Sequence, residues 1–191
     1  MPRSGRLQRP SDFTGSTLNS FRQVFLRHGL PGALLALLGF FLVSPETVAA
    51  AFSRPYANPT VYLVGALVVF FGLSSYVVWL DRRCDLAQLG WVLYLGALSF
   101  WEEWLFRLVL PFTAADWGVP LLAATFVSNL LFGLVHYFTL RWRWQWCLLA
   151  FLGGLALSRH MTTHFDLLLI TCFHWIGTLI NTPRAPGNNE R

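Results

Sequence analysis

Two adjacent glutamates and an arginine stand out because they lie inside an apolar stretch, in the segment that runs from Glu102 and Glu103 to Arg107. Two histidines, His136 and His174, lie in similarly apolar stretches. A buried carboxylate can act as a general base, and a histidine can act as an acid, a base or a hydrogen-bond donor. Together these groups could activate a water molecule and stabilise negative charge on an attacked carbonyl oxygen.

The helical spacing of the first segment separates its charged residues into two groups. Glu103 and Arg107 are four residues apart, so one helical turn brings them together as an ion pair. Glu102 points about 100° away from Glu103, which leaves it free to face other helices. We interpret Glu103 and Arg107 as a structural network that links helices. For Glu102 we favour chemistry, because histidines are available on two other segments.

Each histidine has polar companions on its own helix face. Asn129 lies two turns before His136, and Thr178 and Asn181 follow His174 by four and seven residues. A histidine beside a hydroxyl or an amide could donate hydrogen bonds to a developing oxyanion. A single buried histidine more often bridges helices, but two of them together with a buried carboxylate favour catalysis.

Other residues with metal-binding side chains give a weaker pattern. His160 and His164 have the four-residue spacing of a metal pair, with Asp166 as the one nearby third ligand. We interpret them as part of a solvated loop or helix end. The cysteines have no paired spacing and predict neither a disulfide framework nor a zinc site; they are Cys84, Cys147 and Cys172.

The composition indicates which elements position these residues. Hydrophobic residues make up 55% of the chain and charged residues 12%, whereas charged residues are about a quarter of a typical soluble domain. Apolar stretches near the ~20 residues that a bilayer requires cover residues 30–43, 60–80, 90–112, 120–140, 144–158 and 166–182. We therefore predict an all-α, polytopic transmembrane helical bundle of about six spans. Ionisable groups inside such spans cost about 2.5–3.5 kcal/mol each, so they usually serve a function.

The ends of the chain are polar. We predict a cytoplasmic N-terminal tail over residues 1–28, a transmembrane domain over 29–182 and a C-terminal tail over 183–191. Ser44 and Pro45 form a helix-start signature, which predicts a short surface helix to about residue 52. The basic start and first apolar run also resemble a signal peptide, but the 28-residue leader favours a retained span.

The arginines predict the orientation. With the N-terminus in the cytoplasm, eleven arginines fall in inside segments and two, Arg54 and Arg159, fall outside. Because the arginines flank apolar runs instead of forming one basic face, the net charge of +5 indicates membrane topology and not nucleic-acid binding. We expect a multi-pass protein of the bacterial inner membrane, with the lipid bilayer as a partner.

The motifs resemble those of the CAAX protease and bacteriocin-processing family of intramembrane proteases, also called the type II CAAX endopeptidase or glutamic-type group. Its first motif, two glutamates, three residues and an arginine, matches Glu102 to Arg107. Its second, Phe, three residues and His, matches Phe132 to His136. Its third is a His followed four residues later by Asn or Asp, where this chain has His174 and Thr178. The resemblance covers roughly residues 90–182.

The resemblance implies an intramembrane endopeptidase whose partner is a membrane-anchored peptide or protein substrate. In such an enzyme Glu102 and His136 would activate a water that attacks a peptide carbonyl. The resemblance also implies that His174 stabilises the oxyanion and that Glu103 and Arg107 support the site. Thr178 departs from the family pattern, so Asn181 or Asn129 would have to share the oxyanion. Two histidines and one carboxylate could hold zinc, but the glutamic-type resemblance predicts neither a metal nor another cofactor.

Two alternatives remain open from the sequence. One is a non-catalytic membrane protein of the same fold, such as a bacteriocin immunity or adaptor protein, which the Thr178 departure favours. The other is a small transporter or proton relay, because Glu and His within spans also mark ion paths. Proteases of this group act on prenylated C-termini, peptide leaders or C-terminal sorting signals, and a small chain with short loops favours a sorting signal or a peptide.

Overall fold

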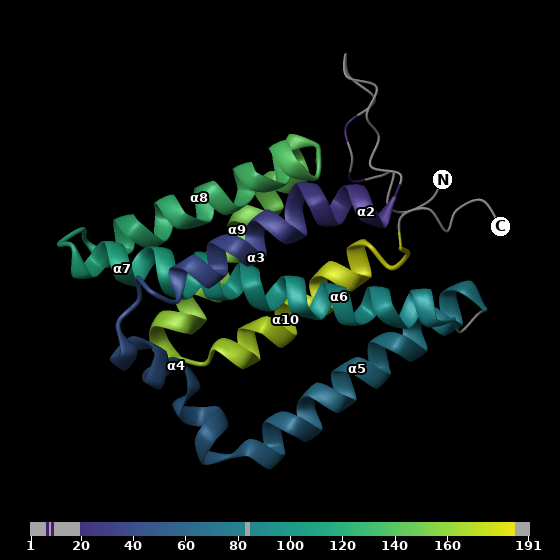
Figure 1. Ribbon diagram of the computed structural model, residues 1–191, viewed down its shortest axis with the longest axis horizontal. Coiled ribbons are helices and arrows are strands. Elements are labelled where there is room, and N and C mark those ends of the chain that lie inside the picture. The colour runs from purple at the N-terminus through teal and green to yellow at the C-terminus, as the bar shows by residue number, and fades with distance from the viewer. Residues whose placement is uncertain (1–6, 8, 10–19, 83–84, 186–191) are drawn as a thin grey trace.

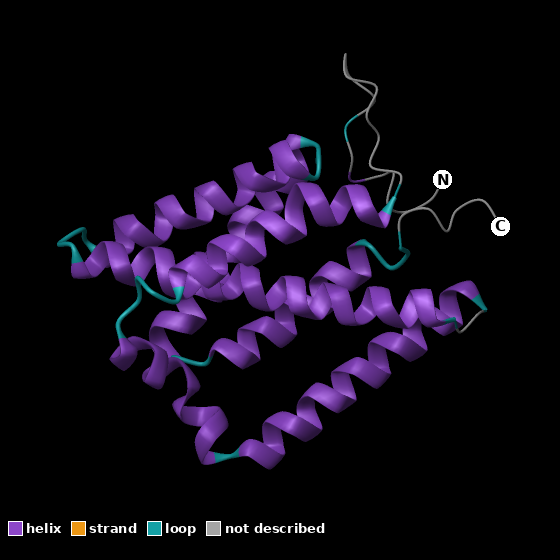
Figure 2. Cartoon of the chain, in the orientation of Figure 1, coloured by secondary structure: helices purple, strands orange, loops and turns teal. Residues whose placement is uncertain are grey.

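The computed structural model describes residues 7, 9, 20–82 and 85–185 of the chain, and its fold is all-helical (Figure 2). The N-terminal half contains α2 (Phe21–Val24), η1 (Phe25–Gly29), α3 (Leu30–Gly39), α4 (Pro45–Ala57) and α5 (Pro59–Asp81). The second half contains α6 (Leu86–Glu103), η2 (Trp104–Val109), α7 (Leu110–Asp116), α8 (Leu121–Thr139), α9 (Trp144–His164) and α10 (Leu167–Asn181). The elements η1 and η2 are π-helical turns within longer helices.

Several of these elements join end to end. The helices α2, η1 and α3 are continuous, as are α6, η2 and α7, so each of the six predicted apolar stretches corresponds to one long helical segment. The first of these segments begins at Phe21, inside the predicted tail. The rest of the two predicted tails, apart from residues 7, 9, 20 and 183–185, lies outside the described residues. The helix of the fifth stretch, α9, continues beyond the apolar residues to His164.

Side-chain caps explain where several helices begin. Ser44 accepts a hydrogen bond from the backbone N–H of Thr47, and Pro45 occupies the first turn of α4, which confirms the predicted helix start. The helix then runs to Ala57, beyond the predicted end. Asp85 caps α6 in the same way, and Asp166 caps α10. The last two caps fix the starts of α6, which carries Glu102, and of α10, which carries His174.

The packing places α6 in the middle of the bundle (Figure 1). It contacts α10, α3 and α5, while α8 packs against α9 and against the η2–α7 segment. One hydrophobic cluster centres on η2 and includes Trp104, Phe106 and Leu108. A second joins α5, α6 and α10 through residues such as Val77, Leu95 and Leu179. The segment that carries Glu102 and Glu103 therefore lies where the two clusters meet.

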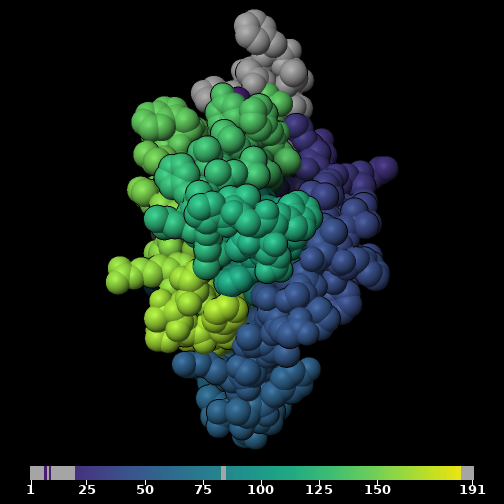
Figure 3. Space-filling model, turned by 90° about the vertical axis from the view of Figure 1, so that its left-hand side faces the viewer, coloured from purple at the N-terminus to yellow at the C-terminus, as the bar shows by residue number. Residues whose placement is uncertain are grey.

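Much of the outer surface is apolar. The exposed side chains of α5 include Val61, Leu63, Val68 and Phe71. In the side view of Figure 3 the corner formed by α7 and α8 faces the viewer, with the blue N-terminal helices on one side and α9 on the other. Within the described residues, α5 and α8 are long and apolar enough to cross a membrane. A crossing by each of the other four segments stays a prediction.

Candidate active site

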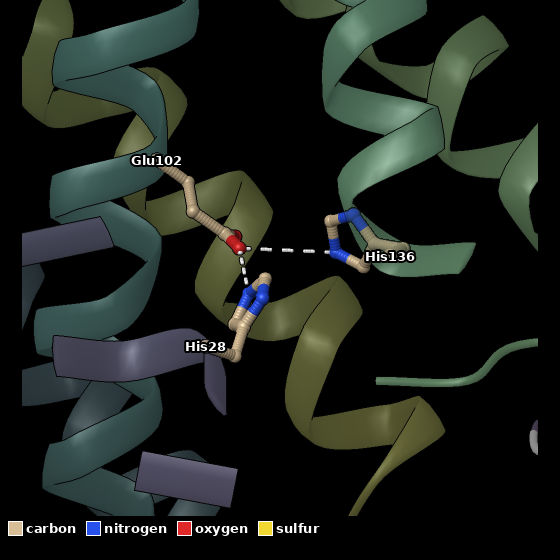
Figure 4. A group of neighbouring side chains, drawn as sticks. All are labelled: His28, Glu102 and His136. Carbon is tan, nitrogen blue, oxygen red and sulfur yellow. Dashed lines mark hydrogen bonds and ion pairs between the residues drawn. The ribbon is translucent and has the colours of Figure 1, made fainter. Parts of the chain in front are cut away.

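Glu102 lies at the centre of a buried polar cluster built from four helical segments. Its side chain is 7% exposed and points from the last turn of α6 towards His28 of η1 and His136 of α8 (Figure 4). The Oε1 atom lies 2.6 Å from His28 Nε2 and 3.8 Å from His136 Nε2. On the other side, Oε2 lies 3.4 Å from Nε2 of His174 on α10. The fold therefore brings together Glu102, His136 and His174, the three residues predicted from the sequence.

The hydrogen bonds of His136 determine which of its ring nitrogens carries a proton. Its Nδ1 lies 2.8 Å from the carbonyl oxygen of Phe132. Because a carbonyl can only accept, Nδ1–H must be the donor, and in the neutral ring Nε2 has a free lone pair. The ring also packs against Phe132 and Trp142, each with a centroid separation of 4.6 Å. This arrangement holds the basic nitrogen towards Glu102.

Glu103 has a different set of partners from Glu102, as the helical spacing predicted, although both carboxylates contact the ring of His174. Its Oε2 lies 3.2 Å from Nε of Arg107, and its Oε1 lies 2.6 Å from Nδ1 of His174. The guanidinium also lies over the ring of Phe132, 3.9 Å from the centroid, where a cation–π contact is favourable. Glu103 and Arg107 are both fully buried, so this network links η2, α8 and α10 and orients His174.

The structure does not bring all the proposed oxyanion residues to Glu102. Thr178 is half-buried one turn after His174, and its hydroxyl makes no hydrogen bond to the described cluster. The amide of Asn181 donates to Gly177 O at an exposed position. A part for Asn181 in stabilising the oxyanion stays a prediction.

Asn129 has a structural task instead. Its amide is buried and donates to Thr125 O and to Ser158 Oγ, both at 2.8 Å. Seven residues span about 10 Å along a helix, so Asn129 shares a face with His136 but lies at another depth. It therefore cross-links α8 and α9, and its part in stabilising the oxyanion stays a prediction.

A cavity of about 140 Å³ leads to Glu102. It lies between α6, α8 and the N-terminal helix, which consists of α2, η1 and α3. Its walls are mostly apolar. Leu35 and Trp101 belong to its lining and are partly exposed on the outer surface, whereas Arg27 lines it beside His28. The exposure of Leu35 and Trp101 places part of the lining at the surface between the helices.

His28 is the member of the cluster that the sequence reasoning missed. It lies within the predicted tail, next to Arg27, and its polar neighbours concealed its place in a helix. Ser20 and Gln23 form a reciprocal capping box at the start of α2, and this spacing is a recognised helix-start signal. It would have indicated that the helix begins at Phe21 and carries His28 into the bundle.

Three of these side chains have the chemistry of metal ligands. They are His28, Glu102 and His136. Each offers one ligand atom, and these three atoms lie within 4.8 Å of one another. Two histidines and a carboxylate are a common zinc set, with Zn–N and Zn–O distances of about 2.0–2.2 Å, so two atoms on one tetrahedral ion lie roughly 3.3 Å apart. The 2.6 Å between His28 Nε2 and Glu102 Oε1 fits a direct hydrogen bond better. The histidines of α9 are not part of this group, and Asp166 instead caps α10 and accepts from Tyr62.

The comparisons with known proteins place the chain in a family. The family model described as type II CAAX prenyl endopeptidase Rce1-like matches residues 85–180, which is half of the chain. The chain belongs to this family. No curated protein and no solved structure matches it. Membership of the family implies a CAAX protease with a protein substrate, and together with the two candidate spans it indicates a membrane protein.

Proposed function

We propose that this protein is an intramembrane endopeptidase that hydrolyses a peptide bond in a membrane-associated peptide or C-terminal signal by means of a glutamate-activated water. The observation that carries the proposal is the burial of one carboxylate, Glu102, among histidines from three other helical segments. Such a group is expensive to place inside an apolar bundle. A catalytic task explains why it is there.

The proposed reaction starts with a water between Glu102 and His136. A separation of 3.8 Å between Oε1 and Nε2 is too long for a direct hydrogen bond but allows one water to contact both atoms. As the water oxygen attacks the carbonyl carbon, its proton passes to this pair. It then moves to the leaving amine when the C–N bond breaks. His174, doubly protonated so that both ring nitrogens can donate, would donate Nε2–H to the oxyanion.

The network behind His174 supports this role. Nδ1–H of His174 donates to Glu103, whose charge is balanced by Arg107. A ring held in this way presents Nε2 towards the Glu102 side of the cluster. Thr178 lies one turn after His174 on the same helix face. We infer that it assists the oxyanion in place of the Asn or Asp of the family pattern.

We further propose that the six long helical segments all cross the inner membrane, with the N-terminus in the cytoplasm. Arg9, Arg141 and Arg143 belong to predicted inside segments, and backbone hydrogen bonds join residues 7 and 9 to this α8–α9 connection. Arg184 pairs with Asp81 at the end of α5, another predicted inside segment. Cysteine labelling in the 81–88 segment tests the orientation, and labelling from the outside would contradict it.

The direct test of the activity is cleavage of a membrane-anchored reporter by the purified protein in detergent or vesicles. We expect cleavage that persists in the presence of a strong chelator, because a carboxylate and a histidine activate the water. Chelator-sensitive cleavage that zinc restores would replace the glutamate mechanism with a metal mechanism. No cleavage of reporters with C-terminal signals or peptide leaders would favour a non-catalytic protein.

A further inference from the structure

His28 lies outside the segment that matches the family, yet it makes the shortest contact to Glu102. Its side chain is 4% exposed, and its two ring nitrogens are both engaged. Nε2 lies 2.6 Å from Glu102 Oε1, and Nδ1 lies 2.6 Å from Thr139 Oγ1 on α8. The N-terminal helix therefore supplies a residue of the cluster that the matched segment lacks.

The hydrogen bonds around Thr139 fix the direction of this chain of contacts. The Thr139 hydroxyl donates to Val135 O at 2.7 Å. A hydroxyl has one proton, so its oxygen must accept from Nδ1–H of His28. The short contact on the other side of the ring then places a single proton between Nε2 and Glu102. His28 is therefore locked in one orientation, with Nε2 directed at the carboxylate.

The local backbone brings the ring this close. The His28 turn is π-helical, and so is the turn that follows Glu103; such turns often occur at functional sites. At Gly29 a Cβ atom would collide with the Tyr94 hydroxyl of α6. The glycine thus permits the close approach of the N-terminal helix to the helix that carries Glu102.

We propose that His28 is a positioning residue that holds the Glu102 carboxylate with Oε1 directed at the attacking water, and that Thr139 fixes the His28 ring for this purpose. The proposal rests on the proposed function. A glutamate side chain has several rotatable bonds, so its carboxylate can take up several positions. Misplacing a catalytic group by about 1 Å can lower the rate about 10²-fold. The charged and titratable groups that face His28 are Glu102 from α6 and His136 from α8, whose ring centroid is 5.3 Å away.

The test compares kcat and KM for reporter cleavage by the full-length chain and its variants. We expect His28→Leu to lower kcat about 10- to 100-fold with KM changed less than about twofold. His28→Gln, whose amide N–H can still reach Glu102, should retain at least about tenfold more kcat than His28→Leu. Thr139→Val should lower kcat by a smaller factor and should add nothing in the His28→Leu background, because both changes disturb one contact. His164→Leu and His164→Gln, at the exposed end of α9, serve as matched controls.

The outcomes separate this inference from the proposed function. Unchanged kcat in His28→Leu, or an equal loss in the Leu and Gln variants, would overturn the positioning role while leaving the Glu102 mechanism intact. Cleavage that is insensitive to Glu102→Gln would overturn the proposed function itself. If His28→Leu does not fold, the kcat values of His28→Gln and Thr139→Val decide, each measured per folded molecule. If both values equal that of the unaltered chain, His28 has only a packing role.

Discussion

His136 faces Glu102 with Nε2 and binds the carbonyl oxygen of its own helix with Nδ1. Because Nδ1–H donates to Phe132 O at 2.8 Å, the nitrogen 3.8 Å from Glu102 Oε1 is the one that can accept a proton. Two basic atoms at this separation can share one water. The relationship explains why a FxxxH spacing and a glutamate on another helix belong to one site.

The oxyanion side of the cluster should depend on His174 more than on Thr178. We expect His174→Ala to lower kcat by about 10²-fold or more, and Thr178→Ala to cost less, because the Thr178 hydroxyl has no hydrogen bond to the described cluster. Thr178→Asn, which restores the family pattern, should retain cleavage. Steady-state kinetics on the reporter checks the order, and a larger loss in Thr178→Ala than in His174→Ala would contradict it.

Arg107 should matter for folding more than for chemistry. Its side chain is fully buried beside Glu103 and over Phe132, and removing one partner of a buried pair costs about 3–5 kcal/mol. We expect Arg107→Met to reduce the membrane abundance and the unfolding midpoint in detergent. Replacing both partners, with Glu103→Gln added, should recover part of the stability, and Arg159→Gln at the exposed end of α9 should change neither quantity.

Two adjacent glycines of α9 give a matched pair for the packing of this network. A Cβ at Gly154 would lie within 3.0 Å of Asn129 Oδ1 and of Arg107 Nη2, whereas one at Gly153 would meet nothing within 4 Å. We expect Gly154→Ala to destabilise the protein by about 1–3 kcal/mol. Gly153→Ala should be neutral or stabilising by up to about 1 kcal/mol because it improves helix propensity. Denaturation in detergent measures both, and the opposite order would contradict the close contact.

The cavity beside Glu102 should be the path of the substrate. Leu35 belongs to its lining, whereas the adjacent Leu34 does not, although both are about half exposed. We expect Leu35→Trp to fill part of the space and to lower kcat/KM about tenfold or more, while Leu34→Trp leaves it unchanged. Equal activity of the two variants would show that the substrate reaches Glu102 by another route.

Most of the long helices and the central cluster could be predicted from the sequence, and the reasons are physical. Apolar length identified the helices, and ionisable residues inside them identified Glu102, His136 and His174. Same-face arguments give the helix face of Asn129 and Asn181 but not their distance from Glu102, because residues two turns apart share a face but differ in depth by about 10 Å. His28 was missed because tertiary packing, and not apolar periodicity, draws the N-terminal turn into the bundle.

The central claim is that the Glu102 carboxylate activates the water. Glu102→Gln keeps the shape and a hydrogen-bonding oxygen but removes the base, so its effect isolates the chemistry. The measurement is the single-turnover rate of reporter cleavage by the purified Glu102→Gln variant, beside His164→Gln as a control and at equal folded concentration. A rate about 10²-fold or more below that of the unaltered chain, with His164→Gln unaffected, is the predicted result. A rate within about twofold of the unaltered chain would contradict the claim and remove Glu102 from catalysis.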